Sequence, residues 1–138
     1  GFTSTAWPSQ SKEEFWASNS PLYSILQAGW IKIFGPELIV TRSLSYILGF
    51  VAVILISIGL KNFNLVKSEI LRKFSMLFLL MMFPIAYAYK IGRPDVVCLF
   101  LSSSIFAAAS FPVSRVRNIL LVFSSMLTPF ANLSVIFL

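Results

Sequence analysis

Four stretches of this chain carry no charged residue. They hold 18, 16, 19 and 21 residues, and a helix needs roughly 17–25 residues to cross the hydrocarbon core of a bilayer. Because lipid offers no water to an unpaired backbone group, each stretch is predicted to be a helix that satisfies its own hydrogen bonds. The four stretches are 43–60, 74–89, 96–114 and 118–138.

The composition favours a membrane protein and limits the chemistry available to it. Hydrophobic residues make up 57% of the 138 residues and charged residues 12%, with a mean hydropathy of +0.85, outside the usual range of soluble domains. The chain has no histidine and a single cysteine, Cys98, so the commonest general base and an intrachain disulfide are both excluded. Acid–base chemistry falls to five carboxylates, Glu13, Glu14, Glu37, Glu69 and Asp95.

The charges between the uncharged stretches predict an orientation. If all four stretches cross, loops 61–73 and 111–117 lie on the same side, while loop 90–95 lies on the other side with two basic residues. Because cytoplasmic loops are enriched in Lys and Arg, the first two loops are predicted to be cytoplasmic, and residues 1–42 with 90–95 to lie outside. The net charge of +6 then reflects topology, and no nucleic-acid partner is predicted. The cytoplasmic basic residues are Lys61, Lys67, Arg72, Lys73, Arg115 and Arg117.

Residues 21–34 are predicted to form an amphipathic helix. Pro21 suits a first helical turn, and Gly35-Pro36 suits a helix end. Nearby tryptophans and tyrosines are typical of a helix that lies in the outer membrane interface. Helical spacing places Leu22, Ile25, Leu26, Gly29, Trp30 and Ile33 on one face, with Ser24, Gln27 and Lys32 toward the other.

The sequence therefore predicts an all-α integral membrane fold in two parts. Residues 1–42 are expected to form an extracytoplasmic first loop with an interfacial amphipathic helix, and residues 43–138 about four transmembrane helices. The chain begins with Gly1 rather than Met and ends on an apolar run, so it is expected to be a fragment of a larger protein. Multi-pass insertion predicts a bacterial inner or plasma membrane, or the endoplasmic reticulum membrane, with membrane lipids as partners.

Four short motifs occur in order on the predicted outer side. They are Asn19-Ser20-Pro21-Leu22-Tyr23, Phe34-Gly35, Thr41-Arg42-Ser43-Leu44-Ser45, and Tyr89-Lys90-Ile91-Gly92-Arg93-Pro94-Asp95. Over roughly residues 10–110, their order and spacing resemble those of C-type-fold (GT-C) glycosyltransferases. The similarity is to the branch of the protein O-mannosyltransferases and of the aminoarabinose transferase that modifies lipid A. This chain departs from that pattern at Asn19-Ser20, where the family often has His-Pro.

The resemblance implies an inverting glycosyltransferase that moves a sugar from a polyprenyl-phosphate carrier to a lipid, glycan or protein acceptor on the extracytoplasmic face. In the family, an aspartate of the first loop is the base that activates the acceptor while the lipid phosphate leaves. In this chain the main base would lie upstream of Gly1, so the fragment alone is expected to be inactive. Such chemistry needs a carboxylate near the anomeric carbon and positive charge near the departing phosphate.

Asp95 is the leading catalytic candidate among the residues present. It is the chain's one aspartate and stands at the outer start of the third uncharged stretch. Its carboxylate can orient the acceptor or bind a divalent cation, the one cofactor considered, or it can cap a helix beside Arg93. Glu14, with its neighbour Glu13, is a weaker candidate for the base, because adjacent carboxylates on a polar loop are commonly solvated.

Four further residues are predicted to contact substrate. Arg93 and Lys90 suit the phosphate of the carrier, with anchoring to lipid headgroups as the alternative. Arg42 has the same two interpretations. Tyr23 is either a substrate contact or an aromatic residue of the membrane interface.

The alternative is a transporter, a flippase or a structural membrane subunit without catalysis. Transporters usually place polar or ionisable groups at mid-membrane depth. No charge falls inside the four stretches, which favours a site at the outer interface. The sequence signals for broken helices, and hence for transport, are Pro84 and Pro129.

Overall fold

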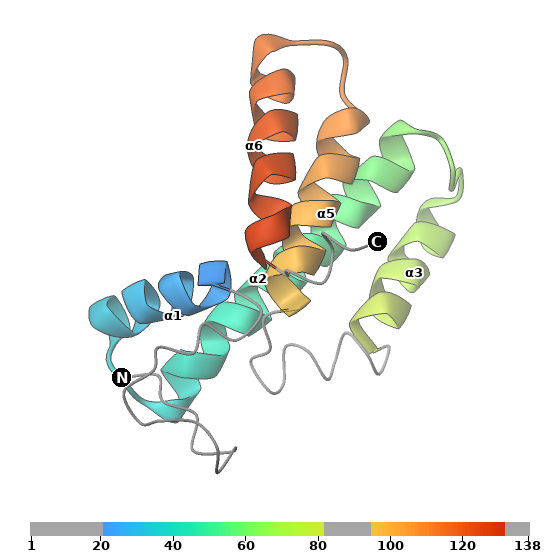
Figure 1. Ribbon diagram of the computed structural model, residues 1–138. Coiled ribbons are helices and arrows are strands. Elements are labelled where there is room, and N and C mark those ends of the chain that lie inside the picture. The colour runs from blue at the N-terminus through green and yellow to red at the C-terminus, as the bar shows by residue number, and fades with distance from the viewer. Residues whose placement is uncertain (1–20, 82–94, 132–138) are drawn as a thin grey trace, which may run out of the picture.

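The computed structural model describes residues 21–81 and 95–131, and its regular structure is entirely α-helical. The helices are labelled in Figure 1. They are α1 (Pro21–Phe34), α2 (Leu38–Asn62), α3 (Glu69–Met81), α5 (Asp95–Ala109) and α6 (Arg115–Ala131). The all-α class predicted from the sequence is therefore confirmed for the described residues.

Helix α1 covers the residues predicted for the amphipathic helix. It begins at Pro21, whose fixed φ suits a first turn and whose missing N–H is not needed there. It ends before Gly35, which has a φ of 99° and donates its N–H to the Ile31 carbonyl at 2.8 Å. Glycine adopts this left-handed conformation without a steric penalty, so the chain turns sharply at Gly35 and enters α2.

The face of α1 that packs on the protein differs from the predicted apolar face. Tyr23, Gln27 and Trp30 point toward α2, so Gln27 lies against the protein rather than on the outer polar side. Ile25 and Ile33 remain 68% and 73% exposed. Part of the predicted apolar face of α1 is thus left uncovered, as expected for a helix on a membrane surface, whereas Leu22 of the same face packs on the core. The placement of α1 in the membrane interface stays a prediction.

Helix α2 begins five residues before the predicted start at 43. Glu37 has extended backbone angles and precedes the first helical residue, Leu38, so the helix includes Arg42, whose side chain is exposed. By length and composition, α2 is the one described helix able to cross a membrane. In the structure 39% of its apolar segment is buried, which leaves most of this segment uncovered by protein.

Two serines start helices earlier than the uncharged stretches do. Ser68 Oγ accepts the N–H of Leu71 at 3.4 Å before α3, and Ser114 Oγ accepts the N–H of Arg117 at 3.1 Å before α6. A serine at this position satisfies a donor that the first helical turn leaves unpaired. Residues 69–73 and 115–117, predicted as loop, are therefore helical.

Helices α5 and α6 also differ from the predicted stretches. Helix α5 has 15 residues and ends at Ala109 rather than at 114, ahead of Pro112, which cannot donate to a helix. Helix α6 runs through Pro129 to Ala131, so the predicted break does not occur there. The prediction for Pro84 lies outside the described residues, as do residues 82–89 of the second stretch and 132–138 of the fourth.

Helices α2 and α5 form the centre of the structure. They run in the same direction, since their C-terminal ends meet: Asn62 Nδ2 at the end of α2 donates to Ser110 Oγ just after α5, at 3.1 Å. Helix α6 packs on α5, helix α3 packs on α2, and α1 lies beside the first half of α2 (Figure 1). The loop after α2 and the loop after α5 are thereby brought to the same end of the bundle.

Most of the residues that α2 and α5 bury are small. The ring of Phe106 lies directly on Gly59, where an added Cβ would collide with it. Small residues let helix backbones approach closely, which is typical of helix pairs in membranes. The buried residues are Leu44, Ser45, Gly49, Ala52, Val53, Ser57 and Gly59 on α2, and Val96, Val97, Leu101, Ser103, Ala107 and Ala108 on α5.

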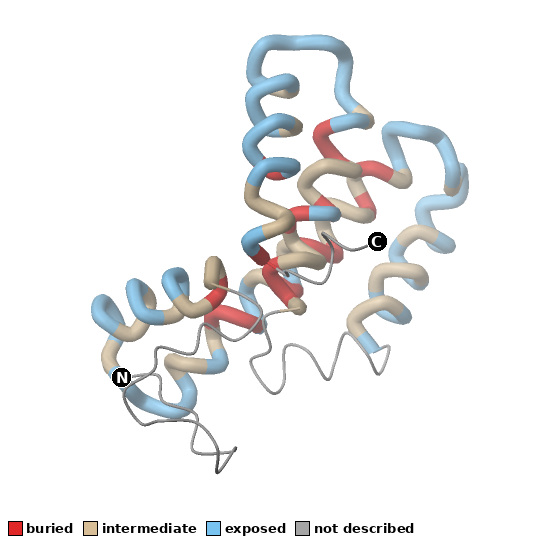
Figure 2. The backbone as a smooth tube through the Cα atoms, viewed as in Figure 1, coloured by how far each residue is buried: buried red, intermediate tan, exposed pale blue. Residues whose placement is uncertain are grey.

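Large apolar side chains cover the outside of the described residues, which Figure 2 maps by burial. Ile70 on α3 is 82% exposed, and Met126 on α6 is 67% exposed. In contrast, the polar side chains buried in the described part of the chain are serines, and Ser103 satisfies its hydroxyl by donating to the Leu99 carbonyl at 2.7 Å. Exposed apolar side chains that form a large contiguous patch are rare on soluble proteins. Contact of this exterior with lipid stays a prediction.

Candidate functional site

Three hydrogen bonds fasten α1 to the first half of α2. Serines of the motif at the head of the first uncharged stretch provide two of the partners, so their hydroxyls are used inside the protein. The third bond reaches a backbone carbonyl of the same motif. The bonds join Tyr23 Oη and Ser45 Oγ (3.0 Å), Trp30 Nε1 and Ser43 Oγ (2.9 Å), and Gln27 Nε2 and the Thr41 carbonyl (3.4 Å).

Tyr23 lies where α1, α5 and α6 meet. Its side chain is 5% exposed and packs in one cluster with Val96, Val97 and Ala131. Burial raises the pKa of Tyr23, and the hydrogen bond with Ser45 lowers it to a smaller extent. The phenol is therefore neutral at physiological pH and serves to join α1 to α2. Substrate contact by Tyr23 stays a prediction.

Asp95 is the first residue of α5 and is half-buried. The two residues that follow it, Val96 and Val97, are each 1% exposed and pack with Tyr23. A carboxylate at this position is stabilised by the positive end of the helix dipole, as the helix-start interpretation requires. The structure thus brings Asp95 and Tyr23, from distant motifs, to the same end of the bundle, which we call the motif end.

The remaining candidate residues are placed differently. Arg42 is exposed on α2, three residues before the buried Ser45, and no described contact joins it to Asp95. The other candidates, Glu13, Glu14, Lys90 and Arg93, lie outside the described residues. Their roles therefore stay predictions from the sequence.

A metal site is not formed by the described residues alone. Residues 21–81 and 95–131 contain no group of three or more Asp, Glu, His or Cys side chains that could hold an ion. A divalent cation at Asp95 would need further ligands from outside these residues, so the cation stays a prediction.

The opposite end of the bundle, which we call the basic end, carries the loops after α2 and α5. The hydrogen bond between Asn62 and Ser110 draws these loops together. Glu69 and Lys73 form an ion pair at 2.8 Å. The hydrogen bond from Lys73 holds the pKa of Glu69 below its usual value. Within the described residues, neither Arg115 nor Arg117 forms an ion pair, so the basic end keeps a surplus of positive charge.

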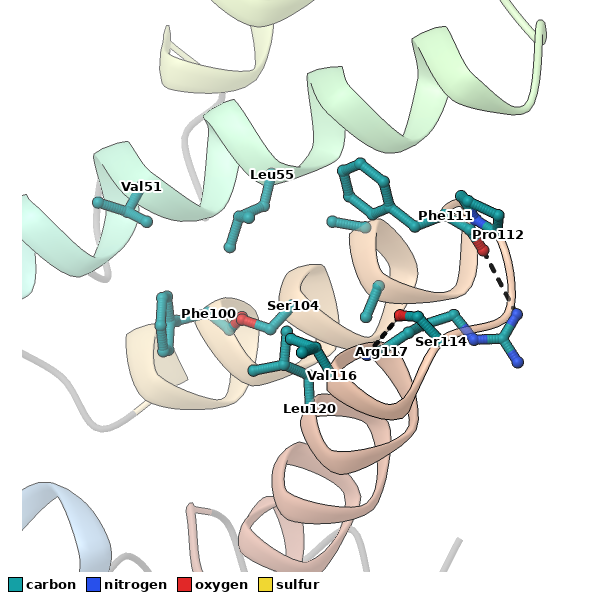
Figure 3. A pocket seen from close by; sticks show the side chains of 12 residues that line it. Val51, Leu55, Phe100, Ser104, Phe111, Pro112, Ser114, Val116, Arg117 and Leu120 are labelled. Atoms are coloured by element: carbon teal, nitrogen blue, oxygen red, sulfur yellow. Dashed lines mark hydrogen bonds between the residues drawn. The ribbon is translucent and has the colours of Figure 1, made fainter.

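A cavity of about 560 Å³ lies between α2, α5 and α6 toward the basic end (Figure 3). Arg117 stands at its rim, where Nη1 donates to the Phe111 carbonyl at 3.3 Å, and Nε and Nη2 each donate to Asn118 Oδ1 at 3.2 Å. The lining is mainly apolar: Val51, Leu55, Phe100, Ser104, Ala107, Ala108, Phe111, Pro112, Ser114, Val116, Arg117 and Leu120.

This cavity was not predicted from the sequence, in which Arg117 indicates only the orientation of the chain in the membrane. The sequence does contain a signal for an apolar surface here. Val116 and Leu120 lie four residues apart on one face of α6, and Arg117 stands between them in the sequence. That pattern gives no volume, however, because the cavity depends on how three helices meet.

Comparison of the chain with protein-family models, with curated proteins and with solved structures gives no match in any of the three. The resemblance to glycosyltransferases is thus a hypothesis that depends on its motifs. The described residues define a class: an all-α protein with one helix long and apolar enough to cross a membrane and an exterior rich in large apolar side chains.

Proposed function

We propose that the chain is part of a multi-pass membrane glycosyltransferase of the C-type fold. It transfers a sugar from a polyprenyl-phosphate carrier to an acceptor on the extracytoplasmic face, and its site lies at the motif end. The observation that carries the proposal is the packing of Tyr23 against Val96 and Val97. This packing brings together the first-loop motif and the motif that ends in Asp95, as one shared site would require.

Insertion of several helices is supported by the distribution of polarity, which is the reverse of that in a soluble protein. Large apolar side chains on α3 and α6 face outward, whereas small residues and serines are buried. Helices α3 and α6 have 13 and 17 described residues, and uncharged residues continue after them to 89 and to 138. Those residues would bring both segments to the length that a bilayer requires.

The orientation is supported by the separation of charge between the two ends. Loops 61–73 and 111–117 meet at the basic end, and six basic residues belong to them. The positive-inside rule then predicts a cytoplasmic basic end and an extracytoplasmic motif end. This is the side on which a carrier-linked sugar would be transferred.

In the proposed chemistry, carboxylates, basic side chains and a tyrosine have separate roles. The Asp95 carboxylate at the start of α5 orients the acceptor or holds a cation, and a second carboxylate acts as the base that takes the acceptor's proton. Arg42, Lys90 and Arg93 stabilise the negative charge of the departing phosphate. Tyr23 positions the first loop through its hydrogen bond with Ser45.

The test is sugar transfer by the native full-length protein in membranes, with Asp95→Asn as the variant. We expect the transfer rate to fall by about a hundredfold, because loss of a group that positions a reactant can cost that much. Glu37→Gln, an exposed carboxylate just before α2, is the matched control and is expected to keep its activity. Turnover by Asp95→Asn equal to that of the native protein would remove Asp95 from the site.

The alternative of a transporter or a structural subunit gives different results in the same membranes. The native protein would then transfer no sugar from any polyprenyl-phosphate donor, whatever residue stands at position 95. Orientation is tested separately by labelling single cysteines placed in loop 61–73 from either side of the membrane. Labelling of that loop from the outside would overturn the proposed topology.

A further inference from the structure

We propose that the cavity between α2, α5 and α6 binds an anionic phospholipid from the leaflet at the basic end. An acyl chain occupies the apolar cavity, and the phosphate of the headgroup meets Arg117 at the rim. This inference rests on the membrane insertion proposed above but is independent of sugar transfer, because neither Asp95 nor Tyr23 is among the residues that line the cavity.

The cavity has the size and chemistry for an acyl chain. Its volume of about 560 Å³ is typical of pockets that take small ligands. Side chains from three helices line it, among them Leu55 of α2, Phe100 of α5 and Leu120 of α6 (Figure 3). Water inside would find few polar partners there, whereas a hydrocarbon chain needs none.

The cavity opens on the outside of the bundle, where a lipid can enter sideways. Val116 and Phe111 both line it and are 67% and 48% exposed. Leu120, one helical turn below Val116, is 50% exposed. An acyl chain that runs along α6 from Phe111 toward Leu120 would cover these side chains and keep its headgroup beside the loop.

Arg117 is held in place for an anion at the mouth of the cavity. Its contacts with the Phe111 carbonyl and with Asn118 Oδ1 use three N–H groups of the five that a guanidinium has. The remaining donors suit phosphate oxygens, which guanidinium groups bind in charge-assisted hydrogen bonds. No carboxylate in the described part of the chain neutralises Arg117.

The charge around the rim favours an anionic headgroup over a neutral one. Helix α6 has no acidic residue in its first turn, so the positive end of its dipole is not countered by a carboxylate. Arg115 lines a second apolar groove on the neighbouring side of α6, together with Ile119 and Val122. An apolar helix seated in the cavity would bring no countercharge, whereas an anionic lipid supplies both the hydrocarbon and the negative charge.

The experiment uses the native full-length protein in nanodiscs of equal parts phosphatidylcholine and phosphatidylglycerol. Lipid that stays bound after detergent extraction is identified by native mass spectrometry. We expect the wild type to retain phosphatidylglycerol in preference to phosphatidylcholine. Arg117→Gln is expected to lower this preference about fivefold, the effect of one basic residue near an anionic surface. Val116→Trp, which fills the opening from an exposed position, is expected to lower the retention of both lipids.

Two control variants separate a specific site from general charge or bulk. Lys67→Gln removes the same charge from an exposed loop position at the same end, and Ile70→Trp adds the same bulk on α3. Both are expected to change lipid retention by less than about twofold. Circular dichroism checks that each variant keeps its helix content.

The proposal fails if Lys67→Gln lowers the preference as much as Arg117→Gln does, because the binding would then be diffuse. It also fails if the wild type retains no phosphatidylglycerol, or if Val116→Trp retains as much lipid as the wild type. A protein that keeps the lipid but transfers no sugar would refute the proposed function and leave this site standing. A protein that transfers sugar but retains no lipid would refute this lipid site and leave the proposed function standing.

Discussion

Helices α3 and α5 both pack on α2, but they differ in what they bury. Helix α5 contributes buried residues along its whole length, from Val96 to Ala108. Helix α3 contributes none, and its contact with α2 leaves Phe74 and Phe78 64% and 58% exposed. The difference shows that α2 and α5 form the fixed centre of the described structure, whereas α3 lies at its margin.

Side-chain size explains why α5 comes closer. The surface of α2 that faces α5 contains Gly59 and Ala52, and the ring of Phe106 fills the space that a side chain at position 59 would take. Phe106 also lies 5.5 Å from the ring of Phe63, centroid to centroid. Close backbone approach of this kind gives helix pairs in lipid much of their packing energy, and the bulky residues of α3 offer no equivalent.

The largest effect is expected at Gly59, where the ring of Phe106 leaves no room for a side chain. Gly59→Ala places a methyl group against the ring of Phe106, so we expect the free energy of unfolding to fall by about 1–3 kcal/mol, as overpacking usually costs. Unfolding of the full-length protein by SDS in micelles, followed by circular dichroism, measures this loss.

The control for this variant is Gly29→Ala in α1, where nothing lies within 4 Å of the added Cβ. Alanine is the better helix former by about 1 kcal/mol, so stability should be unchanged or slightly raised. The double variant Gly59→Ala/Phe106→Leu replaces the ring with a smaller side chain and should recover part of the lost stability. If Gly59→Ala behaves like Gly29→Ala, then α5 does not approach α2 as closely as the structure has it.

The next effect is expected at Tyr23, which extends the α2–α5 centre to α1. Tyr23→Phe removes the hydrogen bond to Ser45 and leaves a serine hydroxyl with no exposed surface. We expect a loss of about 1–2 kcal/mol in unfolding free energy. The double variant Tyr23→Phe/Ser45→Ala removes both partners and should be less destabilised than the tyrosine variant alone. A double-mutant cycle that shows no coupling energy between Tyr23 and Ser45 would contradict the hydrogen bond between them.

Alkaline pH tests the same contact without a substitution. Burial raises the pKa of Tyr23 above the ordinary value of 10.0, so the neutral phenol stabilises the folded state. This stabilisation is complete below pH 10 and is lost as the pH rises through the higher pKa of the folded protein. We expect the stability of the wild type to fall more steeply above pH 10 than that of Tyr23→Phe. Parallel curves for the two proteins would exclude a buried phenol at this position.

Several helix ends could be predicted because they depend on local chemistry. Both ends of α1 follow from Pro21 and Gly35, which act through their own backbone angles. The uncharged stretches misplace the starts of α2, α3 and α6, because each stretch begins only after a charged residue that the helix in fact contains. Arg42 shows why this fails, since an exposed side chain can carry a charge within a helix. Ser68 and Ser114, as N-caps, were the better signals.

The candidate site was less predictable because it depends on tertiary register. The sequence marks Tyr23 and Ser45 as members of two motifs but does not show that they bond to each other across 22 positions. That pairing requires the turn at Gly35 and the angle at which α1 lies on α2. The cavity beside Arg117 likewise exists only where three helices meet. Residue types could be read from the chain, but their partners could not.

The smallest effect is expected on α3, the helix that contributes no buried residue. Glu69 and Lys73 form an ion pair at 2.8 Å, but their side chains are 65% and 72% exposed, so water and salt screen the attraction. Lys73 lowers the pKa of Glu69, so the pair stabilises the fold above the ordinary carboxyl pKa and stops doing so as the pH falls through the lower pKa of the folded protein.

Replacing this glutamate, in Glu69→Gln, should therefore leave SDS unfolding at neutral pH unchanged within error. Whatever small stabilisation the pair gives should be present at pH 7 and absent at a pH low enough to protonate Glu69. Glu37→Gln removes the same negative charge from an exposed position without a described ion pair, so it controls for the change in net charge. A loss as large as that of Gly59→Ala would mean that the start of α3 is fixed as firmly as α5, and the division between a tight centre and a marginal helix would not hold.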